Sequence, residues 1–298
     1  MTKAVISYSD TISAFAELGI APGDTLLFHS SIKSIGWIDG GAKTVAEALV
    51  NAVSPNGTLV APTFTFARKP ARVPLIDPQN DGCDTGAINA AVLRMPSARR
   101  SLALTHSFAV IGKHQADICD IRPELCPLGD EGPFRVLMDL DAKILLLGVA
   151  YTHCTAGHFA EYLCQVPYRE TFTQPARIRN PDGSERETSL VLYGPKNGVA
   201  YPPRNFNRAG NMLEERGLVS IGTLGNAYIR LFRIRDFVSL VQEKWRQGDN
   251  VLSWGPGQTE NSVLKDGHTV EVWFQDALGN RNHTVRSVVE ITPEASRQ

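Results

Sequence analysis

The sequence lacks the features that would place the protein in a membrane or on a nucleic acid. No apolar run approaches the roughly eighteen residues that a membrane-spanning helix needs, and no basic segment followed by a long apolar one stands at the amino terminus. The formal net charge of −1 gives no basic surplus for nucleic acid or anionic lipid. We therefore expect a cytoplasmic protein that binds small molecules, and neither nucleic acid nor a membrane.

Metal-binding motifs are also missing. The five cysteines are odd in number and have no CxxC spacing, so they are typical of reduced thiols. There is no HExxH motif, and the segment from His158 to Tyr162 has no second histidine where an HxxEH motif needs one. We therefore expect no metal ion. Cys154 remains an alternative nucleophile because it lies close to His158 in the chain.

Apolar runs and helical periodicity alternate along most of the chain. The predicted strands are 25–29, 58–61, 107–111 and 143–149, and the predicted helices are 10–18, 45–53, 86–94, 134–140, 207–216 and 226–245. This alternation predicts an α/β fold, a layered α/β/α sandwich with a mixed, largely parallel central sheet. Around the turn at 180–183, the composition predicts an additional β-hairpin region at about 172–200.

We expect two units along the chain. Residues 1–248 would form the main α/β domain, with the hairpin as an insertion, and residues 249–298 would form a carboxyl-terminal β-hairpin appendage. In the appendage, segments 269–274 and 285–291 flank a turn at Gly279-Asn280. The proline-rich stretch between Phe64 and Asp84 has no periodicity, and loops of that length are usually functional or mobile.

The most informative motif follows the apolar run 143–149. A helix is expected to begin near Thr155, so that His158 and Glu161 share one helix face at the carboxyl edge of the sheet. Glu161 can then fix the tautomer of His158, and an imidazole that titrates near neutrality suits a general base. A packing or capping role remains the alternative for a single pair of this kind.

Two further segments have the composition of anion sites. Gly40 and Gly41 precede a helix, whose first backbone N–H groups attract anions, but the spacing is not that of a Walker A motif and plain turn chemistry explains it equally well. Arg100 stands beside Ser101 and close to Ser107, and guanidinium and hydroxyl groups together suit phosphate. A solvated basic loop is the alternative for this second segment.

Taken together, the order of these motifs resembles the antibiotic N-acetyltransferase family, whose best-known members are aminoglycoside 3-N-acetyltransferases. The matching segments are 29–36, 40–45, 57–64, 99–101, 106–108, 143–148, 155–161 and 225–227. The chain departs from the family's pattern at Ala90, at Ser97 and at 131–133, and its last fifty residues lie outside the match.

The resemblance implies an acyltransferase that uses acetyl-coenzyme A and acetylates a primary amine of an aminoglycoside or amino-sugar-like acceptor. It implies that His158 is the general base, that Glu161 orients it, and that Thr155 donates to the developing oxyanion. The positions implied for acetyl-CoA are Ser30, Ser31, Gly41, Arg100, Ser101 and Ser107, and those for the acceptor are Phe64, Asp77 and Asp84.

The charge of the expected acceptor region argues for a less cationic amine than an aminoglycoside drug. Polycations need several carboxylates, whereas basic residues accompany the acids of this region: Arg68, Lys69, Arg72, Arg204 and Arg208. Two alternatives stay open, a catalytically idle coenzyme A-binding protein and a histidine-based or metal-assisted hydrolase. The chain is expected to be a monomer or a homodimer.

Overall fold

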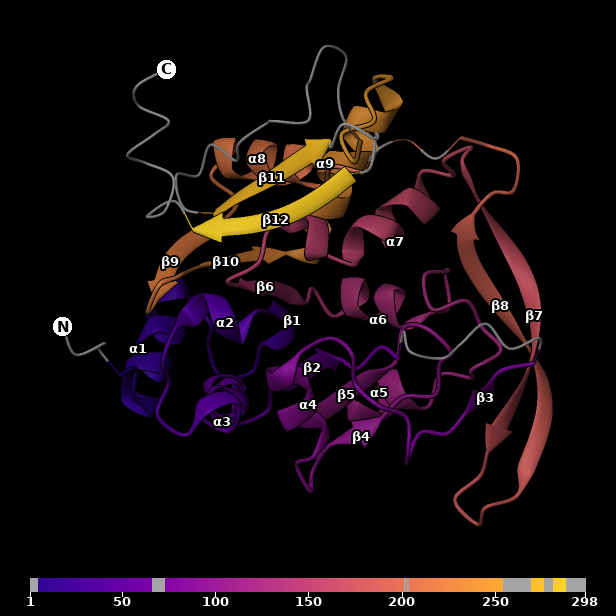
Figure 1. The fold of residues 1–298 in the computed structure, drawn as a ribbon, viewed down its shortest axis with the longest axis horizontal. Coiled ribbons are helices and arrows are strands. Elements are labelled where there is room, and N and C mark those ends of the chain that lie inside the picture. Colours follow the sequence, from indigo (N-terminus) through magenta and orange to yellow (C-terminus); the bar gives the residue numbers. More distant parts are fainter. Residues whose placement is uncertain are drawn as a thin grey trace.

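The computed structural model describes residues 5–65, 73–200, 202 and 204–253, together with the backbone of 269–275 and 281–287. A seven-stranded sheet runs through the middle of the molecule in the order β4-β5-β2-β1-β6-β10-β9 (Figure 1). Its strands are β1 (Thr25–Ser30), β2 (Thr58–Pro62), β4 (Arg99–Arg100), β5 (Phe108–Gly112), β6 (Lys143–Leu147), β9 (Ser220–Leu224) and β10 (Ala227–Arg233).

The sheet is mixed, as predicted. β1 pairs in parallel with β2 and β6 at its centre, and every other neighbouring pair is antiparallel. It follows that β1, β2, β4, β6 and β9 run in one direction while β5 and β10 run in the other. The carboxyl ends of the three central strands therefore meet at one edge, where open α/β sheets bind their ligands.

Helices cover both faces of the sheet, which confirms the three-layer sandwich. In β1, Leu27 belongs to one buried cluster while Leu26 and Phe28 belong to the other, because successive side chains of a strand point to opposite faces. The first cluster packs under α5 (Gln115–Cys119), α6 (Pro133–Asp139), α7 (Ala156–Leu163), α8 (Asn207–Glu215) and α9 (Ile234–Arg246). The second packs under α1 (Tyr8–Leu18), α2 (Ile32–Ile35), α3 (Gly41–Val53) and α4 (Ala87–Leu93).

The additional β-hairpin region consists of β7 (Arg169–Arg179) and β8 (Glu185–Pro195), which form a long ribbon along one side of the molecule (Figure 1). A short strand from the proline-rich stretch, β3 (Leu75–Ile76), pairs in parallel with β7 and completes a three-stranded sheet. A small cluster that includes Ile76, Ile178 and Leu190 packs at this sheet. The hairpin thus begins at residue 169, immediately after α7 and its following turn.

The predicted helix at 226–245 is wrong in its first third. Residues Ala227–Arg233 form β10, and only α9 is helical. Ile229 and Leu231 pack on one side of the sheet and Phe232 on the other, while Arg230 is fully buried and pairs with Glu214. This interior strand is therefore buried on both faces and is not a half-exposed strand. The short elements α2, α5, β3, β4 and β9 were not predicted.

At the carboxyl end, β11 (Thr269–Gln275) pairs antiparallel with β12 (Arg281–Ser287). The second strand begins earlier than the predicted 285–291, and the predicted turn at Gly279-Asn280 lies outside the described residues. The division of the chain at residue 248 stays a prediction. Among the helices that the structure describes, none combines the length and the apolar character needed to cross a bilayer.

Candidate active site

A cavity of about 480 Å³ opens at the carboxyl ends of the three central strands. Ser30 at the end of β1, Phe64 just after β2 and Val149 just after β6 contribute to its wall. The beginnings of α4 and α7 close it from the two helical layers, and Arg204 and Phe206 border it before α8. The cavity thus lies where the topology of the sheet favours a ligand site.

His158 reaches this cavity from the first turn of α7. A 3-10 turn (Tyr151–His153) follows β6, and Thr155 then occupies the N-cap position of the helix. Glu161 follows one helical turn later and is almost fully buried, with 2% of its surface exposed. Nδ1 of His158 lies 2.6 Å from Oε2 of Glu161. The structure therefore brings the predicted His–Glu pair together.

Three donors converge on the Glu161 carboxylate. Besides His158, the Tyr168 hydroxyl donates to Oε1 at 3.2 Å, and Nη1 of Arg169 donates to Oε2 at 3.0 Å. Because a carboxylate beside a guanidinium is ionised and only accepts hydrogen bonds, the network assigns the proton of His158 to Nδ1. Nε2 is then the unprotonated nitrogen of the ring.

The surroundings of His158 keep its ring neutral. Burial is the largest cause that lowers the pKa of His158, and Glu161 opposes it. The nearby guanidinium groups of Arg169 and Arg204 lower the pKa further. Nη1 of Arg204 lies 3.4 Å from Nε2. A neutral imidazole with an ionised carboxylate behind it can accept a proton from a ligand in the cavity.

Tyr168 and Arg169 were missed at the sequence level, although they complete the contacts of Glu161. They stand at the start of the hairpin, where the guanidinium of Arg169 also stacks on the ring of Tyr193 at 4.8 Å from its centre. Asn250 in turn donates to the Tyr168 hydroxyl at 3.0 Å. No local sequence pattern links the start of the hairpin to α7. The contacts of Tyr168 and Arg169 with Glu161 therefore become visible only once β7 pairs with β8 and the hairpin lies against α7.

Gly157 lets the ring of Phe206 pack against α7 beside His158. The rings of Phe206 and His158 meet edge to face, with centroids 5.2 Å apart, and a Cβ atom at residue 157 would collide with the Phe206 ring. Gly157→Ala is therefore expected to lower the free energy of unfolding by about 1–3 kcal/mol, measured by urea denaturation. Combining it with Phe206→Leu should restore part of the loss, and no restoration would contradict this origin.

Three further histidines line the cavity, His29, His106 and His153. Burial lowers the pKa of His29 to about 3, with a smaller contribution from His153. Burial, His158 and Arg169 together lower the pKa of His106 to about 3. Nε2 of His29 accepts the backbone N–H of Thr155 at 3.4 Å, which requires the neutral ring. His29 and His106 therefore contribute no positive charge to the cavity at neutral pH.

Acid is expected to destabilise the protein through His29. Because its pKa is about 3 when folded and about 6.5 when unfolded, the unfolded chain binds the proton first, and stability falls as the pH drops below about 6.5. Between about pH 8 and pH 5 the loss from this group is about 2 kcal/mol. Urea unfolding across that range measures it. His29→Gln should reduce the pH dependence and His114→Gln should not; equal slopes for the parent and His29→Gln would contradict the assignment.

Of the residues predicted to bind acetyl-CoA, Ser30 lines the cavity. Its hydroxyl donates to Asn89 at 3.1 Å, and Asn89 donates to the carbonyl of Pro62 at 2.8 Å. Ser31 occupies the N-cap position of the short helix α2, where its hydroxyl accepts a hydrogen bond from Ser34 at 3.0 Å. Gly41 begins α3 and is not part of the cavity wall.

Arg100, Ser101 and Ser107 make internal contacts rather than line the cavity. The guanidinium of Arg100 donates to the carbonyls of Thr63 and Asp81, each at 2.5 Å, and to that of Gly82 at 2.9 Å. The Ser107 hydroxyl donates to Thr63 at 2.7 Å, and Ser101 accepts the N–H of Phe108 at 2.9 Å. These bonds brace the loops that carry Phe64 and Asp84, and a contact of the three residues with acetyl-CoA stays a prediction.

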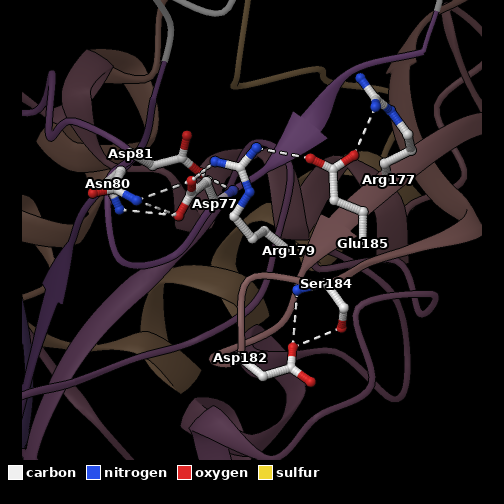
Figure 2. Close-up of polar contacts among 8 residues, drawn as sticks. All are labelled: Asp77, Asn80, Asp81, Arg177, Arg179, Asp182, Ser184 and Glu185. Atoms are coloured by element: carbon white, nitrogen blue, oxygen red, sulfur yellow. Dashed lines mark hydrogen bonds and ion pairs between the residues drawn. The ribbon is translucent and has the colours of Figure 1, made fainter.

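Among the residues predicted for the acceptor, Phe64 and Asp84 line the cavity, whereas Asp77 lies outside it, where the loop after β3 meets the hairpin (Figure 2). Asp77 accepts from Arg179 at 2.6 Å and from Asn80 at 3.0 Å. The Asn80 hydrogen bond is the largest cause that holds the pKa of Asp77 below its usual value, and Arg179 adds to it. Asp77 therefore ties the loop to the hairpin, and a role in binding the acceptor stays a prediction.

Cys154 lies in the cavity wall but is poorly suited to act as a nucleophile. Burial raises the pKa of its thiol to about 12, so the thiolate that would react is scarce at neutral pH. Within the part of the chain that the structure describes, no three histidine, cysteine, aspartate or glutamate side chains are grouped so as to hold a metal ion. The chemistry of the described cavity therefore centres on His158.

Comparisons with known proteins find similar sequences over most of the chain. A family model described as aminoglycoside 3-N-acetyltransferase matches residues 27–246. Aminoglycoside N(3)-acetyltransferase IV of Salmonella sp is 30% identical over 236 residues, which cover 78% of this chain and 84% of that protein. The SPbeta prophage-derived aminoglycoside N(3')-acetyltransferase-like protein YokD of Bacillus subtilis (strain 168) is 28% identical over 255 residues, covering 76% of this chain and 88% of that protein.

Solved structures show the same fold. Aminoglycoside acetyltransferase AAC(3)-Xa superposes with a TM-score of 0.73 at 26% identity, and the match covers 84% of this chain and 95% of that one. A histidine-to-alanine variant of AAC(3)-IVa in complex with a gentamicin superposes with a TM-score of 0.65 at 26% identity, covering 86% of this chain and 94% of that one.

Proposed function

The chain belongs to the aminoglycoside 3-N-acetyltransferase family of acyltransferases, and we propose that it transfers an acetyl group from acetyl-CoA to a primary amine of an aminoglycoside or amino-sugar-like acceptor, with His158 as the general base. The observation that carries the proposal is the geometry of His158. Its Nδ1 is held by a buried carboxylate at 2.6 Å, so that Nε2 is the nitrogen left to accept a proton in a cavity of about 480 Å³.

His158 would act twice in the reaction. Its Nε2 takes a proton from the acceptor ammonium, so that the nitrogen gains a lone pair and forms a bond to the thioester carbonyl carbon. The carbon–sulfur bond then breaks, and the departing thiolate takes up the proton from His158. A second proton leaves the new amide nitrogen for solvent, so the products are the amide, free coenzyme A and one proton. Glu161 stabilises the imidazolium that forms between these steps.

Thr155 is the proposed donor to the oxyanion that develops on the thioester oxygen. It lies in the cavity wall at the N-cap of α7. Its backbone N–H already donates to His29, so its hydroxyl is the group that would meet the oxyanion. For the donor substrate, Ser30 is the predicted residue that the structure brings into the same wall. Phe64 and Asp84 would contact the acceptor from the opposite loops.

Steady-state release of free thiol from acetyl-CoA tests the proposal. The panel contains kanamycin, gentamicin and glucosamine, and a reaction without amine measures hydrolysis. We expect release that depends on an amine, together with a mass increase of one acetyl group on that amine. Coenzyme A binding without release would instead indicate an idle binding protein, and release without an amine would indicate a hydrolase.

A further inference from the structure

The charges around the cavity do not form the acidic cleft that a polycationic acceptor needs. The described lining carries one carboxylate, Asp84, and one guanidinium, Arg204. The buried carboxylate behind the wall, Glu161, is already paired with Arg169 at 3.0 Å. His29 and His106 stay neutral, and the third of these histidines, His153, brings no carboxylate, so the described groups carry no surplus of negative charge. Binding several ammonium groups here would remove them from water without enough carboxylates to compensate.

Arg204 occupies the place that the acceptor amine must reach. Its Nη1 lies 3.4 Å from Nε2 of His158, and its guanidinium lies over the ring of Phe206, 5.6 Å from the centre. The backbone at Arg204 pairs with Ser253, and the next residue donates to the carbonyl of Leu252 at 2.9 Å. Main-chain pairing therefore fixes the backbone from which Arg204 reaches the proposed base.

No carboxylate of the residues described here lies within ion-pair distance of Arg204, although the other arginines near His158 and along the hairpin are paired. A guanidinium in such a position favours a bidentate anion such as a carboxylate or phosphate. An anion on the acceptor would draw Arg204 away from Nε2 and would place the neighbouring amine against the base. A polycation would instead meet repulsion from Arg204 at the point of reaction.

We propose that the acceptor carries an anionic group, a carboxylate or a phosphate, close to the amine that is acetylated, and that Arg204 binds this group. The inference rests on the proposed function, whose acceptor it narrows to an anionic amino sugar or a similar amine. Selectivity then comes from one attractive contact for the anion and one repulsive contact for a polycation.

A matched set of amines tests the inference: glucosamine, its carboxylate analogue glucosaminate, glucosamine 6-phosphate, and kanamycin. We expect kcat/KM at least tenfold higher for glucosaminate or glucosamine 6-phosphate than for glucosamine, and lowest for kanamycin. Comparison of the two anionic compounds shows which anion the site prefers and at what distance from the amine. Kanamycin as the best acceptor of the parent protein would overturn the inference while leaving acetyl transfer established.

Variants of Arg204 separate its role from general effects of charge. Arg204→Gln should lower kcat/KM for the preferred anionic amine at least tenfold more than for glucosamine, and Arg204→Glu should shift the preference towards kanamycin. Arg94→Gln removes the same charge from an exposed residue at the end of α4 and should leave the preference unchanged. An unchanged ratio of anionic to neutral amine in Arg204→Gln would contradict the inference.

Calorimetry with the same four compounds and with coenzyme A measures their binding affinities independently of turnover. If no compound supports thiol release, the proposed function fails, and the binding of the anionic compounds still decides the role of Arg204. If Arg204→Gln weakens coenzyme A and leaves the anionic amines unaffected, the guanidinium serves a phosphate of the donor and the inference is wrong. Tighter binding of the anionic amine to the parent than to Arg204→Gln, with equal affinity for coenzyme A, supports it.

Discussion

Replacing His158 with alanine is expected to lower kcat/KM for acetyl transfer by about 10²- to 10⁴-fold, which is the usual contribution of a positioned base. The variant keeps the cavity but removes the group that takes the proton from the acceptor. Steady-state thiol release with saturating acetyl-CoA measures the change. In the parent, kcat/KM should fall as the pH drops through the pKa of His158, which burial and the two neighbouring guanidinium groups lower from 6.5.

His114 offers the matched control for this substitution. It stands at the N-cap of α5, where Nδ1 lies 2.7 Å from a carboxylate oxygen of Asp117, and it does not line the cavity. His114→Ala should therefore retain the activity of the parent. Full turnover in His158→Ala would remove this residue from the mechanism, provided that both variants unfold at similar urea concentrations.

Replacing Glu161 with glutamine is expected to affect stability and activity together. The side chain of Arg169 is only 8% exposed, so the change leaves its guanidinium buried without a carboxylate partner. Breaking such a buried pair typically costs about 3–5 kcal/mol of stability. It also removes the negative charge that stabilises the imidazolium of His158, so we expect kcat to fall by about 10²-fold. Urea denaturation and thiol release measure the two effects.

Two comparisons make this second prediction specific. Glu243→Gln breaks the pair between Glu243 of α9 and Arg216 at the C-cap of α8, whose side chains are 37% and 39% exposed. Such surface pairs are worth at most about 1 kcal/mol. The double variant Glu161→Gln/Arg169→Gln should be less destabilised than the sum of the single variants, because it leaves no unpaired charge. Additive losses would show that Glu161 and Arg169 do not stabilise each other.

Substitution of Arg169 also changes the acidity of the base. The guanidinium lowers the pKa of His158, so Arg169→Gln should move the acidic limb of the kcat/KM profile to higher pH. A purely structural role would lower kcat without moving the limb. The same profile measured for Arg135→Gln, whose guanidinium pairs with Asp130 at 2.9 Å, provides the reference.

Local sequence patterns predicted the structure correctly where the residues in contact lie close together in the chain. The spacing of His158 and Glu161 places them on one helix face, and the structure pairs them as predicted. The apolar run at β6 is buried on both faces, which indicated an interior strand. The same reasoning failed at Ala227–Arg233, because a short interior strand that is buried on both faces is hard to distinguish from a buried helix by periodicity.

The sequence by itself predicted the three-layer α/β architecture from the spacing of neighbouring residues, and its resemblance to the family gave His158 as the proposed base. Only the tertiary structure decided what surrounds that base. It brought Tyr168 and Arg169 from the hairpin to the buried carboxylate, placed Arg204 at Nε2, and directed Arg100 towards loop carbonyls. These contacts join segments that are far apart in the chain. The strand pairing that brings them together produces no periodic pattern in the sequence from which they could be predicted.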